Sequence, residues 1–158
     1  MDMLKRVGQL ILCVAISFVA GGLGSIATTA NIPTWYAGLD KPPLLPPNEV
    51  FGPVWSVLYL MIGIALFLVW VAATERSKKW AYGAFFLQLV LNTLWSFAFF
   101  GLHLPWLGVV VIVALIGAIV WTIYEFMKVS RLAIWLFVPY LAWVLFATYL
   151  TVGVAVLN

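Results

Sequence analysis

Charged residues are scarce in this chain of 158 residues: they make up 8% of it, against 66% hydrophobic residues. A soluble domain carries about 25% Asp, Glu, Lys and Arg. Together with a mean hydropathy of +1.15, this shortage excludes a soluble globular enzyme, a disordered chain and a nucleic-acid-binding domain. The formal net charge is only +3, so the small basic excess indicates membrane topology rather than a phosphate-binding surface.

Cysteine and histidine are equally rare, with one of each. The single Cys13 excludes a disulfide framework, a multi-thiolate zinc site and a CxxC redox pair, and we expect it to be a small core residue. We expect His103 to be a turn residue at the membrane interface rather than a haem ligand. Phosphate-loop, dinucleotide, serine-hydrolase and zinc-protease motifs are also missing from the sequence, and we expect no metal site.

What the chain has is long uncharged runs, at 7–39, 50–74, 80–124 and 132–158. A helix needs about 20 residues to cross a hydrocarbon core of ~30 Å. The third run is long enough for two helices and is interrupted by Gly101 and Pro105, which are helix-stop residues. The predicted spans are residues 7–29, 53–74, 80–100, 106–124 and 132–157.

These spans predict an all-α integral membrane protein, a single domain over 1–158 built as a bundle of five transmembrane helices. Helices satisfy every backbone polar group internally, which lipid requires. Pro53 is expected in the first turn of the second helix, where its missing N–H is not needed. Pro139 is expected to kink the fifth helix.

Cations divide unevenly between the two sides of such a bundle. One side carries Lys41 alone, and the other carries seven cations: Lys5, Arg6, Arg76, Lys78, Lys79, Lys128 and Arg131. The positive-inside rule then predicts a multi-pass protein of the cytoplasmic membrane, with its N-terminus in the cytoplasm and its C-terminus outside. The absence of Asp, Glu, Lys and Arg from the five spans argues against an ion-driven pump.

The one long loop, 30–52, is expected outside, between the first two helices. It holds five of the eight prolines, together with Trp35 and Tyr36. Proline fixes φ and lowers the entropy cost of ordering a loop. We therefore expect a lid packed over the bundle rather than a flexible linker.

Three spans each carry aromatic residues at helical spacing. The faces are Trp55 with Tyr59 on the second helix, Asn92 with Trp95, Ser96 and Phe99 on the third, and Tyr140 with Trp143 and Ala147 on the fifth. Four other tryptophans, Trp80, Trp106, Trp121 and Trp135, lie near span ends, where interfacial tryptophan is usual. The aromatic faces have two interpretations: helix–helix packing with Asn92 as interhelical glue, or a flat apolar pocket for a planar ligand.

Four segments resemble the TspO/MBR family of tryptophan-rich sensory proteins and translocator proteins. They are WYAGLDKPPLLPP at 35–47, PVWSVLY at 53–59, QLVLNTLWSFAFFG at 88–101 and VPYLAWVLFATYL at 138–150. The resemblance implies a five-helix bundle, usually a homodimer, whose ligand pocket is closed by the loop between helices one and two. Members of that family bind porphyrins such as protoporphyrin IX and haem, and some bind cholesterol.

Carried over to this sequence, the resemblance implies a ligand-binding set with members from the lid and three helices. These residues are Tyr36, Trp55, Tyr59, Asn92, Trp95, Ser96, Trp143, Ala147 and Leu150. The implied function is a membrane receptor or sensor for porphyrins and related planar hydrophobic ligands, with no obligatory cofactor. The alternatives are a light-dependent porphyrin-degrading enzyme that uses Trp55 and Trp143, and a porphyrin or sterol translocator.

The sequence departs from the family pattern in two places. Leu44 stands where the family often has tryptophan in the lid, so the lid offers less aromatic surface. No cation follows Tyr149, so the cholesterol-recognition pattern is incomplete. For the homodimer, the sequence offers stripes of small residues at Ser17-Gly21-Ser25, Ala20-Gly24-Thr28 and Gly83-Ala84.

Overall fold

The computed structural model describes residues 3–74 and 77–158. Its five α-helices are α1 (Met3–Asn31), α2 (Asn48–Val71), α3 (Lys79–Ser96), α4 (Pro105–Met127) and α5 (Arg131–Leu157). All five spans, with that of α3 continuing to Gly101, are long and apolar enough to cross a membrane. The described residues contain no strand. The all-α, five-span prediction is therefore confirmed.

The start of α2 differs from the prediction. The helix begins at Asn48, directly after Pro47, so Pro53 lies inside it rather than in its first turn. The predicted position of Pro53 is therefore wrong. Proline fixes φ, and Pro47 lies in an extended conformation at the end of the lid. The helix starts at the next residue, Asn48, so α2 begins before the uncharged run at 50–74. Pro139 lies within α5, which continues as a helix on both sides of it.

The end of α3 is also modified. A π-helical turn, η2 (Phe97–Gly101), follows it, and the N–H of Leu102 donates to the Phe97 carbonyl over 2.7 Å. His103 then adopts a left-handed φ of 57° before Pro105 starts α4. The predicted hairpin thus lies where Gly101 and Pro105 indicated.

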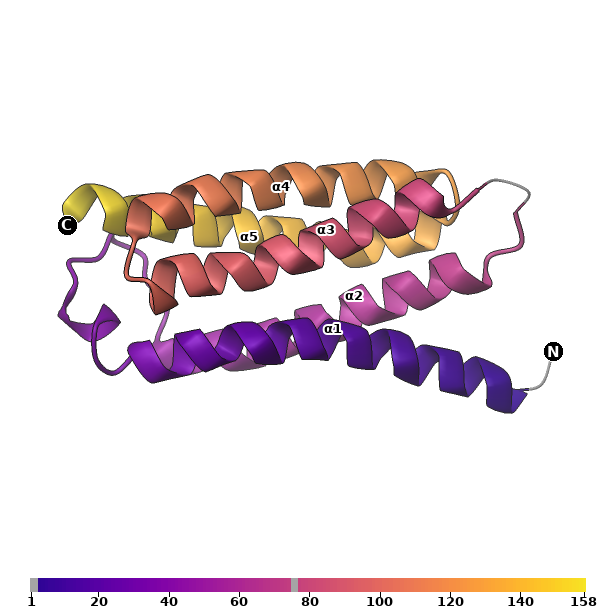
Figure 1. Ribbon diagram of the computed structural model, residues 1–158, viewed down its shortest axis with the longest axis horizontal. Coiled ribbons are helices and arrows are strands. Elements are labelled where there is room, and N and C mark those ends of the chain that lie inside the picture. Colours follow the sequence, from indigo (N-terminus) through magenta and orange to yellow (C-terminus); the bar gives the residue numbers. More distant parts are fainter. Residues whose placement is uncertain (1–2, 75–76) are drawn as a thin grey trace.

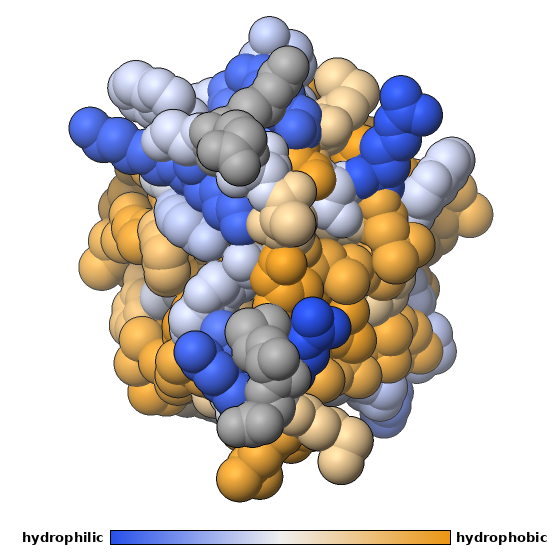
Figure 2. All heavy atoms as spheres, turned by 90° about the vertical axis from the view of Figure 1, so that its right-hand side faces the viewer, coloured by the Kyte–Doolittle hydropathy of each residue, from blue (hydrophilic) through white to orange (hydrophobic). Residues whose placement is uncertain are grey.

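Figure 1 shows the N-terminus, the α2–α3 connection and the α4–α5 connection at one end of the bundle. The C-terminus, the lid and the α3–α4 hairpin lie at the other end. Six of the seven predicted cytoplasmic cations therefore share one end of the molecule, where Figure 2 shows hydrophilic side chains. Arg76, the seventh, lies outside the described residues.

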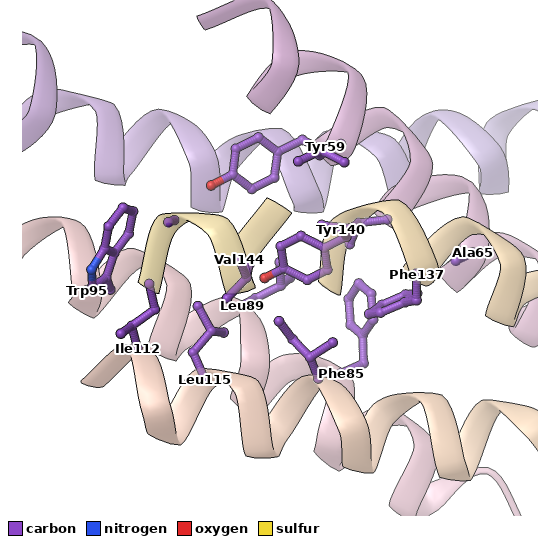
Figure 3. Packing of buried hydrophobic residues seen from close by; sticks show 14 of the residues in the cluster. Tyr59, Ala65, Phe85, Leu89, Trp95, Ile112, Leu115, Phe137, Tyr140 and Val144 are labelled. Atoms are coloured by element: carbon purple, nitrogen blue, oxygen red, sulfur yellow. The ribbon is translucent and has the colours of Figure 1, made fainter. Parts of the chain in front are cut away.

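The core is packed between α3, α4 and α5. The ring of Phe85 stacks on Phe126 with centroids 6.0 Å apart, and Phe126 meets Phe137 edge-on at 5.4 Å. Figure 3 shows Phe85, Phe137 and Tyr140 among the buried side chains that fill this space. In lipid such close contact between rings and aliphatic side chains is the main force that holds helices together.

The small residues of α1 pack against other helices of the same chain. A Cβ added to Gly24 would lie 3.0 Å from Ser96 Oγ, and one added to Gly21 would overlap the Tyr59 ring. Ser17 is fully buried. Gly21 and Gly24, which the sequence offered as parts of a dimer surface, thus pack against α2 and α3 of the same chain, whereas Ser25 is exposed. The dimer and its surface stay predictions.

The lid is shorter than predicted because α1 and α2 extend into both of its ends, which leaves 32–47. It contains the 3₁₀ turn η1 (Tyr36–Gly38) and is attached to α5. Tyr149 donates its hydroxyl to the Pro43 carbonyl over 2.7 Å, and Asn158 exchanges two hydrogen bonds with the Asp40 backbone at 3.0 and 2.9 Å. The lid thus closes one end of the bundle.

Candidate functional site

A cavity of about 510 Å³ lies at the lid end of the bundle. It is lined from α1 by Phe18, Gly21, Gly22, Ser25, Thr28 and Thr29, from the lid by Ile32 and Tyr36, from α2 by Asn48, Glu49, Phe51, Gly52, Trp55, Ser56 and Tyr59, from α3 and η2 by Asn92, Trp95, Ser96, Phe99 and Phe100, and from α5 by Ala147, Leu150 and Thr151. A volume in this range suits a small-molecule site, for which ~300–1,000 Å³ is usual.

The structure brings together every member of the predicted ligand-binding set except one. Tyr36, Trp55, Tyr59, Asn92, Trp95, Ser96, Ala147 and Leu150 all line this cavity. They come from the lid, α2, α3 and α5. Helical spacing indicated those of α2 and α3 and Ala147 of α5, whereas the family resemblance alone indicated Tyr36 and Leu150 as ligand-binding residues. Whether these residues bind a ligand stays a prediction.

Trp143 is the exception. It is not among the lining residues. Its indole ring packs edge to face against Phe51, at 5.8 Å between centroids, and lies 5.6 Å from Phe146. Phe51 does line the cavity, so Trp143 supports the wall through Phe51. Helical spacing places Trp143 on the same side of α5 as Ala147, which lines the cavity. Spacing does not reveal that Phe51 lies between Trp143 and the cavity.

Aromatic rings form the wall around Trp55. Its ring lies 5.6 Å from Tyr59 in a stacked arrangement and 6.2 Å from Trp95 at an angle of 37°. Trp95 in turn stacks on Phe99 at 6.2 Å. These rings present broad apolar faces, which favour flat ligands through offset or edge-to-face contact.

A chain of buried hydrogen bonds lies beneath these rings. Tyr59 donates to Asn92 Oδ1 over 2.5 Å, Asn92 Nδ2 donates to the Tyr140 hydroxyl over 3.0 Å, and Tyr140 donates to Gln88 Oε1 over 2.8 Å. The chain joins α2, α3 and α5. Asn92 therefore links three helices and also lines the cavity. That the aromatic faces form a site for a planar ligand stays a prediction.

Two features of this region had no counterpart in the sequence analysis. Gln88 is fully buried and ends the hydrogen-bonded chain; its position one helical turn before Asn92 was the available signal. The α1 wall was missed because a stripe of small residues has the same appearance whether it packs within a chain or between chains.

Among the described residues, the buried indole N–H of Trp95 has no hydrogen-bond acceptor.

Tyr36 brings the lid into the site. Its side chain is buried, and burial raises the pKa of its phenol above the usual value, so the hydroxyl stays a neutral donor at physiological pH. The Lys41 ammonium lies 5.0 Å from the centre of the Tyr36 ring.

His103 lies outside the lining, at the exposed α3–α4 hairpin. Its ring stacks on Trp35 at 4.5 Å, and its Nε2 lies 2.8 Å from Asn31 Oδ1. Cys13 is fully buried. Both placements agree with the structural roles expected from the sequence.

The model of the TspO/MBR family matches residues 13–157, which include every residue of the cavity wall. The chain belongs to the TspO/MBR family. It is 41% identical to the tryptophan-rich protein TspO of Archaeoglobus fulgidus, over 100% of this chain and 99% of that protein. It is 37% identical to the protein CrtK of Rhodobacter capsulatus, over 91% of both chains.

A TspO/MBR protein from an animal is similar over a shorter stretch. The human translocator protein is 40% identical over 118 residues, which cover 73% of this chain and 70% of the human protein. The names of these relatives support a role as a membrane sensor or translocator, and the chain is a multi-pass membrane protein.

Proposed function

We propose that this TspO/MBR protein is a membrane receptor, acting as a sensor, that binds porphyrins such as protoporphyrin IX and haem in the cavity beneath its lid. The observation that carries the proposal is the group of aromatic rings around Trp55. A planar macrocycle would gain most from broad ring faces in a water-poor site. Related planar hydrophobic molecules would be held by the same surface.

Polar groups at the wall would orient the ring. The hydroxyls of Ser96 and Tyr36 would meet the polar edge of the ligand, whereas the N–H of Trp95 is buried away from the cavity and only the ring face of Trp95 is available. Asn92 has less to offer, because its carbonyl and one amide hydrogen are already engaged. His103 lies outside the wall, so haem would be recognised through its ring and not through an axial histidine.

The test is a titration of the parent protein in nanodiscs with protoporphyrin IX and, separately, with zinc protoporphyrin. The proposal expects saturable quenching of tryptophan fluorescence at one site per chain, with similar affinity for both compounds. Linear, non-saturating uptake equal to that of empty nanodiscs would overturn it. An unchanged porphyrin spectrum after illumination favours pure binding.

Two alternative functions use the same cavity. Loss of the Soret band under light would favour a porphyrin-degrading enzyme that depends on Trp55 and Trp143. The name of the human relative, translocator protein, favours the other alternative, movement of a porphyrin or sterol across the membrane. Movement of porphyrin between the two sides of proteoliposomes would support that alternative.

We place the protein in the cytoplasmic membrane, with its N-terminal end inside and the lid outside, because the cations gather at the N-terminal end. We also propose a homodimer. Gly83 of α3 remains exposed, with nothing within 4 Å of an added Cβ, whereas Ala84 is buried. A detergent-corrected mass of two chains is expected, and a mass of one 17.6 kDa chain would contradict the dimer.

A further inference from the structure

The exposed part of the cavity wall lies on two helices only. From α1 the exposed lining residues are Phe18, Gly22, Ser25 and Thr29, and from α2 they are Asn48, Glu49, Gly52 and Ser56. The lining residues that come from η1, α3, η2 and α5 are all buried. The cavity is therefore open along one side, between α1 and α2, and we call this opening the α1–α2 slot.

The slot has a defined lower end. A Cβ added to Gly63 would lie 2.6 Å from the Val14 Cα, so the backbones of α1 and α2 touch there. Nearer the lid, the Tyr59 ring fills the space above Gly21, and Phe18 lies 6.2 Å from that ring. Between Tyr59 and the lid, α1 and α2 both line the cavity and do not pack directly against each other.

The slot reaches membrane depth. Phe18 and Asn31 are more than three helical turns apart on α1, which is about 20 Å at ~1.5 Å per residue. Ser56 lies a little over two turns into α2, about 12 Å from Asn48. Because both helices are membrane spans, most of the slot faces hydrocarbon and only its outer end, at Asn48 and Glu49, reaches the interface.

The hydroxyl residues along the slot do not prevent an apolar molecule from passing, and Asn48 and Glu49 lie at its outer end. Ser25 donates to the Gly22 carbonyl over 2.7 Å, Thr29 to the Ser25 carbonyl over 2.7 Å, and Ser56 to the Gly52 carbonyl over 2.9 Å. Each hydroxyl is satisfied within its own helix, so it requires no water in the slot.

The other possible route, through the lid, is closed. Pro42 is buried against Gly153, so closely that a Cβ on Gly153 would lie 2.5 Å from the proline ring. Tyr149 and Asn158 hold the lid on both sides of this contact. The lid is thus fastened to α5 by packing and hydrogen bonds, so it would have to detach from α5 to open the cavity on that side.

We propose that the cavity is filled sideways from the bilayer through the α1–α2 slot, so that its ligands are molecules already dissolved in the outer half of the membrane. The inference rests on the proposed function only in taking this cavity as the ligand site. It assigns Gly22 and Gly52 as the positions that control access. A side chain at either position would stand in the slot without displacing a neighbour, because nothing lies within 4 Å of the added Cβ.

The experiment uses a thiol in the cavity as the reporter and no porphyrin. Cys13→Ala removes the only natural thiol, and Ala147→Cys places one on the buried wall of α5. The protein in proteoliposomes is treated with pyrene maleimide, which dissolves in lipid, or with a sulfonated maleimide, which stays in water. We expect pyrene maleimide to react faster with the introduced thiol by about tenfold, which corresponds to ~1.4 kcal/mol in the barrier.

Gly22→Trp should slow the pyrene reaction by about tenfold. Gly117→Trp, at an exposed glycine of α4 that is outside the cavity and equally free of neighbours, should leave it unchanged. If Gly22→Trp does not fold, Gly52→Trp tests the opposite edge of the slot. Circular dichroism and a single gel-filtration peak identify folded variants.

A second pair of substitutions tests the lid route. Tyr149→Phe with Asn158→Ala removes the hydrogen bonds that hold the lid, and should not change the pyrene reaction. The proposal is overturned if both slot variants react at the parent rate, if the sulfonated reagent reacts as fast as pyrene maleimide, or if neither reagent reaches the cavity thiol. These results do not depend on porphyrin binding, so a receptor for some other ligand would still show lateral access.

Discussion

Tyr59 and Asn92 join α2 to α3 at the floor of the cavity through a hydrogen bond of 2.5 Å from the phenol to the amide oxygen. The same amide donates to Tyr140 of α5. One side chain therefore connects three helices and supports the surface on which a ligand would rest. Interhelical hydrogen bonds in membranes average about 0.6 kcal/mol each, but loss of Asn92 leaves more than one buried group without a partner.

We expect Asn92→Leu to lower the free energy of unfolding by about 1–3 kcal/mol, because the buried hydroxyls of Tyr59 and Tyr140 both lose a partner. Tyr59→Phe breaks only one bond and should cost less. Unfolding in mixed detergent micelles measures both changes. Thr29→Val, which removes an exposed bond within α1, is the control, and an Asn92→Leu variant as stable as this control would contradict a structural role for the amide.

Trp55→Leu should weaken porphyrin binding by about 2 kcal/mol, the usual cost of removing a central aromatic anchor. Leucine keeps the site apolar, so the loss reports the missing ring. Trp143→Leu should have a smaller effect, because its ring acts through Phe51. Fluorescence titration of folded variants measures all of these. Trp106→Leu, an exposed tryptophan at the start of α4 outside the wall, should bind like the parent, and equal binding by Trp55→Leu would favour packing alone.

Gly63→Ala should destabilise the bundle by more than ordinary helix propensity explains. The added Cβ would lie 2.6 Å from the Val14 Cα and 3.0 Å from the Cys13 carbonyl oxygen, so α1 and α2 must move apart. Gly117→Ala meets open space and should be neutral or stabilising by up to about 1 kcal/mol. Thermal unfolding in detergent compares the two, and equal melting temperatures would show that this contact is not close.

Leu44→Asn should stabilise the lid. Leu44 has a φ of 66° and is 83% exposed, so it loses little packing when replaced. A left-handed conformation costs most residues roughly 1–2 kcal/mol, and asparagine tolerates it better. Slower proteolysis within the lid is the expected result. Leu102→Asn, at an exposed residue with negative φ, should give no protection.

The orientation can be read from cysteine labelling in intact cells. In a Cys13→Ala background, Leu44→Cys should react with an impermeant thiol reagent, because the lid is expected outside. Ser77→Cys, exposed at the opposite end, should react only after the cells are opened. The reverse pattern would overturn the orientation.

The five spans were predictable because charge interrupts them and because Gly101 and Pro105 divide the one run that is too long. The helix ends were less predictable, as Pro53 shows: a proline that suits a first turn is also tolerated further along a membrane helix. The faces of α2 and α3 followed from helical spacing. On α5 spacing identified only Ala147 among the lining residues, because Tyr140 and Trp143 do not line the cavity. The contribution of α1 did not follow from spacing, because spacing does not tell which partner a stripe of glycine and serine meets.

The π-helical turn after α3 changes the phase of the helix by one residue, or about 100°. Phe99 and Phe100 both reach the cavity wall as a result, although they are neighbours in sequence. Deleting one residue between Phe97 and Gly101 would convert the π-helical turn into an α-helical one. One ring of this pair would then point away from the cavity. The shape of the cavity wall therefore depends on the number of residues in this turn as well as on their identity, and insertions or deletions are a separate means of reshaping the proposed site.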